Sequence, residues 1–167
     1  MAKRVITKIG DVFVALIDNT YKVYFQYIVN DLSLLNSDVI RVFKKKYLKD
    51  EQPTLQEIIK DDIAFYAHCV TNFGIKQGYW EKIGNIKETG DFSQVLFGDK
   101  NDEADINNHE WYVWQINKDT KHVGSLKNNK KKIYPGGIWP SQSIIYKIKY
   151  GYYEGVFGYY ERNYLNT

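Results

Sequence analysis

The sequence has few of the residues that cross-link or interrupt a chain. Its 167 residues include one cysteine, Cys69, so an intrachain disulfide is excluded and a reducing compartment is the natural expectation. Three prolines are present, and no repeat, low-complexity stretch or Pro/Gly/Ser-rich linker divides the chain. We therefore expect a single domain spanning residues 1–167.

Long apolar segments are also missing. The longest apolar stretch, residues 12–17, is far too short to cross a bilayer, and the basic start lacks the apolar region of a signal peptide. We therefore expect a cytoplasmic protein with no membrane partner. The formal net charge is +3, from 23 basic and 20 acidic side chains, which is too small by itself to imply a nucleic-acid partner.

Aromatic residues are abundant, with 15 Tyr, 8 Phe and 4 Trp making up 16% of the chain. Aromatic side chains pack well on pleated surfaces and are enriched both in strands and at protein interfaces. With 44% hydrophobic and 26% charged residues, the composition is that of a folded domain. It favours a β-rich fold.

The hydrophobic pattern predicts mainly strands. Residues 11–17 and 21–29 flank the turn pair Asp18 and Asn19, which predicts a hairpin. Thr54 and Glu57 form a capping box that predicts one short helix ending near residue 61. We expect a mainly β protein (α+β by strict count), a curved antiparallel sheet or barrel-like domain with one short helix. The further strands are predicted at residues 38–47, 63–70, 94–97, 111–116, 122–126 and 144–150.

The sharpest local motif is acidic. Residues 99–110 place oxygen-bearing side chains at positions 1, 3, 5, 7, 9 and 12, which is the order of an EF-hand calcium loop. Ala104 stands where that loop requires glycine, and both flanks read as strands where an EF-hand has helices. A solvated acidic loop fits this segment better, with calcium as an alternative.

Signals of catalysis and of bound cofactors are weak. Cys69 follows His68, but neighbours along a strand point to opposite faces, so the two make a poor catalytic dyad. His68, His109 and His122 lack the spacing of a zinc site. No phosphate-binding glycine motif or nucleophile elbow occurs. We predict that the protein is not an enzyme, has no catalytic residues, and binds no metal and no cofactor.

Lysine runs leave a second functional reading open. They occur at residues 44–46 and at Lys127 with residues 130–132, and tyrosines crowd the end of the chain. A small β-barrel could bind single-stranded nucleic acid through them, with lysines on phosphates and tyrosines stacked on bases. Short lysine runs also occur as solvated strand edges. We treat nucleic acid as the alternative, less favoured partner.

A series of short motifs gives the chain a family likeness. From about residue 8 to residue 150, their order resembles that of the immunity protein 26 family, bacterial proteins of polymorphic-toxin systems. The resemblance implies a cytoplasmic antidote that binds a toxin delivered by neighbouring bacteria and blocks its active site. It implies no cofactor and no catalysis. The motifs lie at residues 8–13, 24–28, 37–43, 66–68, 80–84 and 111–114, with Gly10, Asp11, Phe13, Trp80, Trp111 and Trp114 as shared positions that suit packing and turns as well as contacts.

The toxin-facing surface is predicted from charge. Many bacterial toxins are nucleases with basic clefts, so an inhibitor is expected to present an acidic patch that accelerates association. Residues 99–110 form the strongest acidic cluster, and nearby tryptophans could act as buried anchors. The predicted partner-binding residues are Asp99, Asp102, Glu103, Asp105, Glu110, Trp111 and Trp139.

Overall fold

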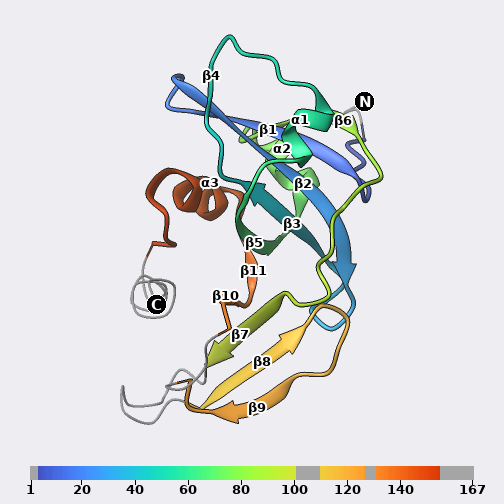
Figure 1. Ribbon diagram of the computed structural model, residues 1–167, viewed down its shortest axis with the longest axis vertical. Helices are drawn as coiled ribbons and strands as arrows, with labels where there is room; N and C mark the ends of the chain where they lie inside the picture. The colour runs from blue at the N-terminus through green and yellow to red at the C-terminus, as the bar shows by residue number, and fades with distance from the viewer. Residues whose placement is uncertain (1–3, 101–109, 127–130, 155–167) are drawn as a thin grey trace.

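Strands dominate the architecture, as the sequence predicts. The computed structural model describes residues 4–100, 110–126 and 131–154, which form eleven strands in two open sheets and three helices (Figure 1). The strands are β1 (Asp11–Ile17), β2 (Tyr21–Asp31), β3 (Ser37–Phe43), β4 (Tyr47–Leu48), β5 (Ile63–Cys69), β6 (Glu81–Asn85), β7 (Leu96–Lys100), β8 (Trp111–Gln115), β9 (Lys121–Gly124), β10 (Ile133–Pro135) and β11 (Ile138–Trp139). The helices are α1 (Leu55–Ile59), α2 (Thr71–Lys76) and α3 (Ser141–Tyr150).

The larger sheet has the strand order β11-β5-β3-β2-β1-β6, with β4 paired to one end of β2. The predicted hairpin of β1 and β2 is confirmed, and its turn residues Asp18 and Asn19 adopt φ values of 48° and 55°. Positive φ at both turn positions matches the right-handed twist of the two strands. All pairings in this sheet are antiparallel except that of β11 with β5.

The smaller sheet has the order β10-β7-β8-β9 and lies beyond the end of the larger one along the long axis (Figure 1). The strands predicted at residues 111–116 and 122–126 are confirmed as β8 and β9, which pair as a hairpin with Asn117 at φ 60° in its turn. The edge strand β10 pairs in parallel with β7. β10 and β11 were not predicted, because strands of three and two residues are too short to show an alternating pattern.

The helices differ from the prediction in number. The capping box is confirmed, since Thr54 caps α1 and Glu57 bonds back to it. The predicted strand at residues 144–150 is wrong, because this segment belongs to α3. Its β-branched isoleucines favour a strand, but Ile144, Ile145 and Ile148 recur at helical spacing and all pack on the core. None of the helices among the described residues is long and apolar enough to cross a membrane.

One hydrophobic cluster is shared by both sheets. Phe25 and Ala67 of the larger sheet belong to the same cluster as Phe97 and Trp114 of the smaller one. A second cluster lies beneath α1 and includes Tyr47 and Ile58, and a third covers the other face of the smaller sheet. The shared cluster fixes how the two sheets meet, and a hollow described below opens at this junction.

Candidate functional site: a seam between the sheets and a lysine pocket

A buried carboxylate joins the two sheets. Asp31, the last residue of β2, is fully buried. Its Oδ2 accepts hydrogen bonds from His68 Nε2 of β5 at 2.8 Å and from Trp114 Nε1 of β8 at 3.2 Å. Its Oδ1 accepts from the backbone N–H groups of Ser33 and Asn117, each at 3.0 Å. One side chain therefore ties the β2–β3 turn to β5, β8 and the β8–β9 turn.

The electrostatics of this junction favour an ionised Asp31 beside a neutral His68. Burial alone would raise the pKa of Asp31, but hydrogen bonds from Ser33, His68 and Asn117 hold that pKa below its usual value. Burial lowers the pKa of His68, and the hydrogen bond to Asp31 offsets only part of this effect. Burial also raises the pKa of the neighbouring Cys69 thiol well above its ordinary value, which keeps the thiol protonated.

The surface above this junction forms a hollow of about 410 Å³, which we call the seam. The β2–β3 turn forms one wall and β7 and β8 form the other. Asn117 Oδ1 accepts a 2.7 Å hydrogen bond from the N–H of Leu32 and holds the turn in place. The lining residues are Ser33, Leu34, Asp99, Lys100, Tyr112, Trp114 and Thr120.

Two leucines project beside the seam. Leu32 is 73% exposed and Leu35 is 85% exposed. Leu35 also has a φ of 53°, in the left-handed region that costs an ordinary residue about 1 kcal/mol. Neither burial nor an easy backbone conformation explains leucine at this position. Outliers of this kind gather at binding sites, so the turn is a candidate contact surface.

The predicted partner-binding residues are distributed over several places. Asp99 is exposed and lines the seam, and Glu110 is exposed with its Oε2 4.0 Å from His122 Nε2. Trp111 is 1% exposed and packs in the cluster on the other face of the smaller sheet. Trp139 stacks on Tyr153, with ring centroids 3.7 Å apart. Asp102, Glu103 and Asp105 lie outside the described residues.

The predicted calcium loop also lies mainly outside the described part of the chain. Its described members are Asp99, Lys100 and Glu110. Within residues 4–100, 110–126 and 131–154, no group of three His, Cys, Asp or Glu side chains could hold a metal ion.

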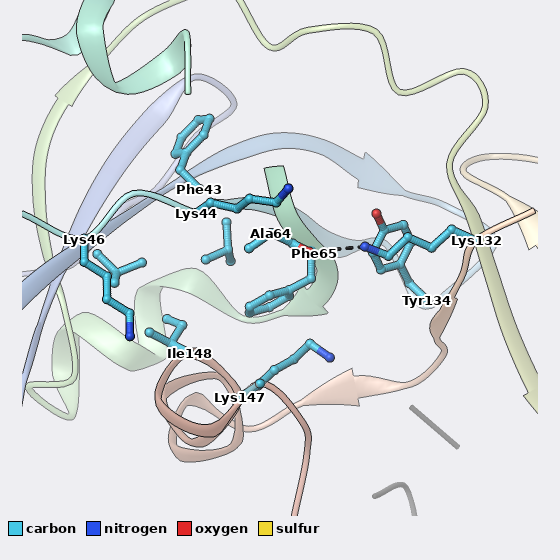
Figure 2. A pocket seen from close by; sticks show the side chains of 12 residues that line it. Phe43, Lys44, Lys46, Ala64, Phe65, Lys132, Tyr134, Lys147 and Ile148 are labelled. Atoms are coloured by element: carbon cyan, nitrogen blue, oxygen red, sulfur yellow. Dashed lines mark hydrogen bonds between the residues drawn. The ribbon is translucent and has the colours of Figure 1, made fainter. Parts of the chain in front are cut away.

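A second hollow, which we call the lysine pocket, lies between the larger sheet and α3 and has a volume of about 170 Å³ (Figure 2). Its apolar lining residues are Val23, Val42, Phe43, Ala64, Phe65 and Ile148. The sequence identified the lysine runs but not Lys147, whose helix was predicted as a strand. It also gave no sign that the two runs meet. The pocket's lysines are Lys44, Lys46, Lys132 and Lys147.

The motif residues behind the family resemblance lie inside the molecule. Phe13 is fully buried, and Trp80 and Trp111 are 2% and 1% exposed. Gly10 adopts a φ of 93°, and the buried Asp11 carboxylate accepts hydrogen bonds from Lys8 N, Asn85 Nδ2 and Lys82 Nζ. These positions serve packing and turns. These motif residues of this chain therefore belong to its scaffold.

The comparisons with known proteins give one match. The family model described as Immunity protein 26 matches residues 8–110, more than half of the chain. This span runs from the segment before β1 to the residue before β8 and includes the β2–β3 turn. No curated protein and no solved structure matches the chain. The match to the family model shows that this chain belongs to the Immunity protein 26 family.

Proposed function

We propose that this protein neutralises a cognate toxin domain by binding it in the cytoplasm, without catalysis of its own. Membership of an immunity protein family carries this proposal. The described surface supports it with two exposed leucines beside an open hollow. A rigid surface that fits a partner suffices for such a role.

The seam is the surface that we assign to the toxin. Burying an exposed leucine contributes about 1.5–3 kcal/mol, so Leu32 and Leu35 together could supply much of the energy of a hot spot. The hollow beside them offers space for a partner side chain against Tyr112. The Asp31 network holds this wall rigidly, which reduces the entropy lost on binding.

Charge is proposed to set the rate of association. In the acidic segment of residues 99–110, Asp99 lines the seam and Glu110 is the other acidic residue that the structure describes. The same segment of the sequence also contains Asp102, Glu103 and Asp105. Acidic groups around an apolar contact steer a basic partner toward it and affect association more than dissociation. In this proposal Trp111 supports the strand that carries Tyr112, and Trp139 packs against Tyr153.

Binding kinetics with the cognate toxin domain test the assignment. The double variant L32S/L35S should dissociate roughly tenfold or more faster than wild type, because lost apolar burial acts mainly on dissociation. L48S is the matched control, since Leu48 is also exposed (66%) but lies on β4 at the other end of the larger sheet. Neutralising Asp99 and Glu110 should instead slow association.

Each element of the proposal can fail separately. Wild-type kinetics in L32S/L35S would contradict the assignment of the seam as the toxin-binding surface. The proposal that the protein binds a toxin would still stand. A wild-type protein that neither binds the toxin domain nor protects cells that express it would remove the immunity function. Chemical modification of the toxin during incubation would contradict neutralisation by binding alone.

A further inference from the structure

We propose that the toxin contact extends from the seam to a second apolar surface, which consists of Ile6, Val70 and Phe73 and which we call the α2 patch. Its occupant is the same toxin domain, through an apolar face that carries a carboxylate opposite Lys76. This inference rests on the proposed function and enlarges its binding surface. It starts from the exposed fractions of the three side chains, which are 64% for Ile6, 36% for Val70 and 52% for Phe73.

One buried threonine brings these side chains together. Thr71 has no exposed surface, and its Oγ1 lies 2.7 Å from the Oγ1 of Thr7, the residue after Ile6. Val70 precedes Thr71, and its carbonyl accepts a 3.0 Å hydrogen bond from the N–H of Phe73. The N-terminal segment and the start of α2 therefore present neighbouring apolar side chains to solvent.

Packing of α2 does not account for Phe73. The helix packs inward through Gly74, which contacts the ring of Trp80, and through Ile75, which joins the shared cluster. Trp80 Nε1 also donates a hydrogen bond to the carbonyl of Thr71. These contacts hold the helix in place, whereas half of the Phe73 side chain stays in water. A large apolar side chain held rigidly at the surface is a feature of binding sites, because little conformational entropy is lost when a partner covers it.

A carboxylate connects the α2 patch to the turn that forms one wall of the seam. Asp38 Oδ2 accepts hydrogen bonds from the N–H and the Oγ1 of Thr71, at 2.8 Å and 2.6 Å. Asp38 follows the β2–β3 turn and pairs with Asn30 of β2. Asn30 Nδ2 in turn donates a 3.1 Å hydrogen bond to the carbonyl of Asn36 in that turn. The exposed Leu35 and the α2 patch therefore belong to the same end of the larger sheet.

The seam by itself is too small for a stable protein interface. Such interfaces cover about 800 Å² on each partner and involve roughly 20–30 residues a side. The seven residues that line the seam, together with Leu32 and Leu35, are less than half of that number. The toxin contact must therefore reach beyond the seam, and the α2 patch supplies exposed apolar surface that hydrogen bonds connect to it.

A lysine beside the α2 patch defines the charge of the partner there. The Nζ of Lys76 lies 5.6 Å from the centroid of the Phe73 ring. A carboxylate on the toxin would pair with this ammonium group at the rim of the apolar contact. Complementary charges at a rim act mainly on association and fix the orientation of the partner.

Dissociation of the full-length protein from the cognate toxin domain tests the extension. The variant V70S/F73S should dissociate roughly tenfold or more faster than wild type, because apolar burial is lost. Val70 is the N-cap of α2, where serine is favourable, so this variant should fold, and urea denaturation verifies it. The matched control L16S/L48S changes two exposed leucines at the other end of the larger sheet and should stay within about twofold of wild type.

Two further measurements test the charge and the extent of the contact. K76E should slow association roughly fivefold or more, whereas K60E, the same charge change beside α1, should leave it within about twofold of wild type. Bound toxin should protect amides of α2 from hydrogen exchange together with those of residues 32–36.

Each part of the inference can be overturned. Wild-type dissociation by V70S/F73S would overturn the extension, and impaired binding by L32S/L35S in the same assay would show that the seam assignment still stands. Protection of residues 32–36 without α2 would also overturn it. Equal effects of K76E and K60E would overturn the carboxylate opposite Lys76. Self-association that V70S/F73S abolishes without changing toxin dissociation would assign the α2 patch to a second copy of this chain instead. Absence of toxin binding by the wild type would overturn the proposed function, and this inference with it.

Discussion

Two buried ionisable side chains, Asp31 and Lys147, lie in opposite electrostatic surroundings. Asp31 is surrounded by donors, and the hydrogen bonds it accepts keep its pKa below the usual value. Lys147 faces aromatic rings, with its Nζ 4.9 Å from the centroid of Phe65 and 4.4 Å from that of Tyr153. Ring faces offset only part of the cost of burying an ammonium group, so the pKa of Lys147 falls to about 7.

The lowered pKa of Lys147 predicts a rise in stability with pH. In the unfolded chain this lysine keeps a pKa near 10.5, so between pH 7 and pH 10 the unfolded state binds more protons and folding becomes more favourable as pH rises. The free energy of unfolding should increase by about 3 kcal/mol from pH 7 to pH 9.5. Urea denaturation should show a rise less than half as large in K147M.

The pH window excludes His68 and Tyr134, and comparison with K147M separates Lys147 from Lys132, whose pKa burial lowers, and from Cys69, whose pKa burial raises. The lowered pKa of His68 affects stability below its ordinary value of 6.5. Tyr134, whose pKa burial raises to about 12, affects stability only where unfolded tyrosine ionises, near pH 10 and above. Equal pH slopes in wild type and K147M would therefore contradict the assignment to Lys147.

At the scale of elements, α2 forms a cradle for one tryptophan. A Cβ atom on Gly74 would lie 1.9 Å from Cε2 of Trp80, so only glycine permits this approach. Trp80 Nε1 donates a 2.9 Å hydrogen bond to the carbonyl of Thr71, and its ring packs edge-on against Phe25 at 5.0 Å. Glycine disfavours a helix, but at position 74 it is the residue that allows α2 to pack against Trp80.

The variant G74A should destabilise the protein by about 3 kcal/mol, because overpacking outweighs the helix preference of alanine. G78A is the control, since Gly78 has a φ of 76° but nothing within 4 Å of a Cβ atom. It should cost about 1 kcal/mol, from backbone strain alone. Urea denaturation of both variants measures the difference, and similar losses would show that the contact with Trp80 is not what requires glycine.

For the molecule as a whole, we propose that the two sheets unfold as one cooperative unit, joined by the shared cluster and by Asp31. The variant D31A should lower stability by about 3 kcal/mol, because it leaves buried donors on Trp114 and Asn117 without their acceptor. D38A is the control, since Asp38 accepts two hydrogen bonds from Thr71 beside the larger sheet alone.

Hydrogen exchange locates the effect of D31A. Amides of β8 and β9 should lose protection more than those of β2 and β3 in D31A but not in D38A, because Asp31 links the smaller sheet to the larger. Wild-type unfolding should follow one transition by both tryptophan fluorescence and circular dichroism. Two separate wild-type transitions would contradict the single unit.

Features encoded by neighbouring residues were predictable. The β1–β2 hairpin follows from two apolar runs around Asp18 and Asn19, and the start of α1 follows from Thr54 and Glu57. The segment of α3 misled the prediction, because isoleucine favours strands while the spacing that decided the outcome was helical. The acidic charge of Asp99 was also visible in the sequence, although its place beside Leu34 in the seam was not.

The sequence by itself determined the β-rich class, the main hairpins, the capped helix and the family, because periodicity, turn chemistry and short motifs act over a few residues. Only the tertiary structure decided which side chains share a surface. It placed the β2–β3 turn beside β8 and gathered Lys44, Lys132 and Lys147 around one hollow. Contacts between residues far apart in the chain depend on how whole elements pack, and local sequence patterns do not predict that packing.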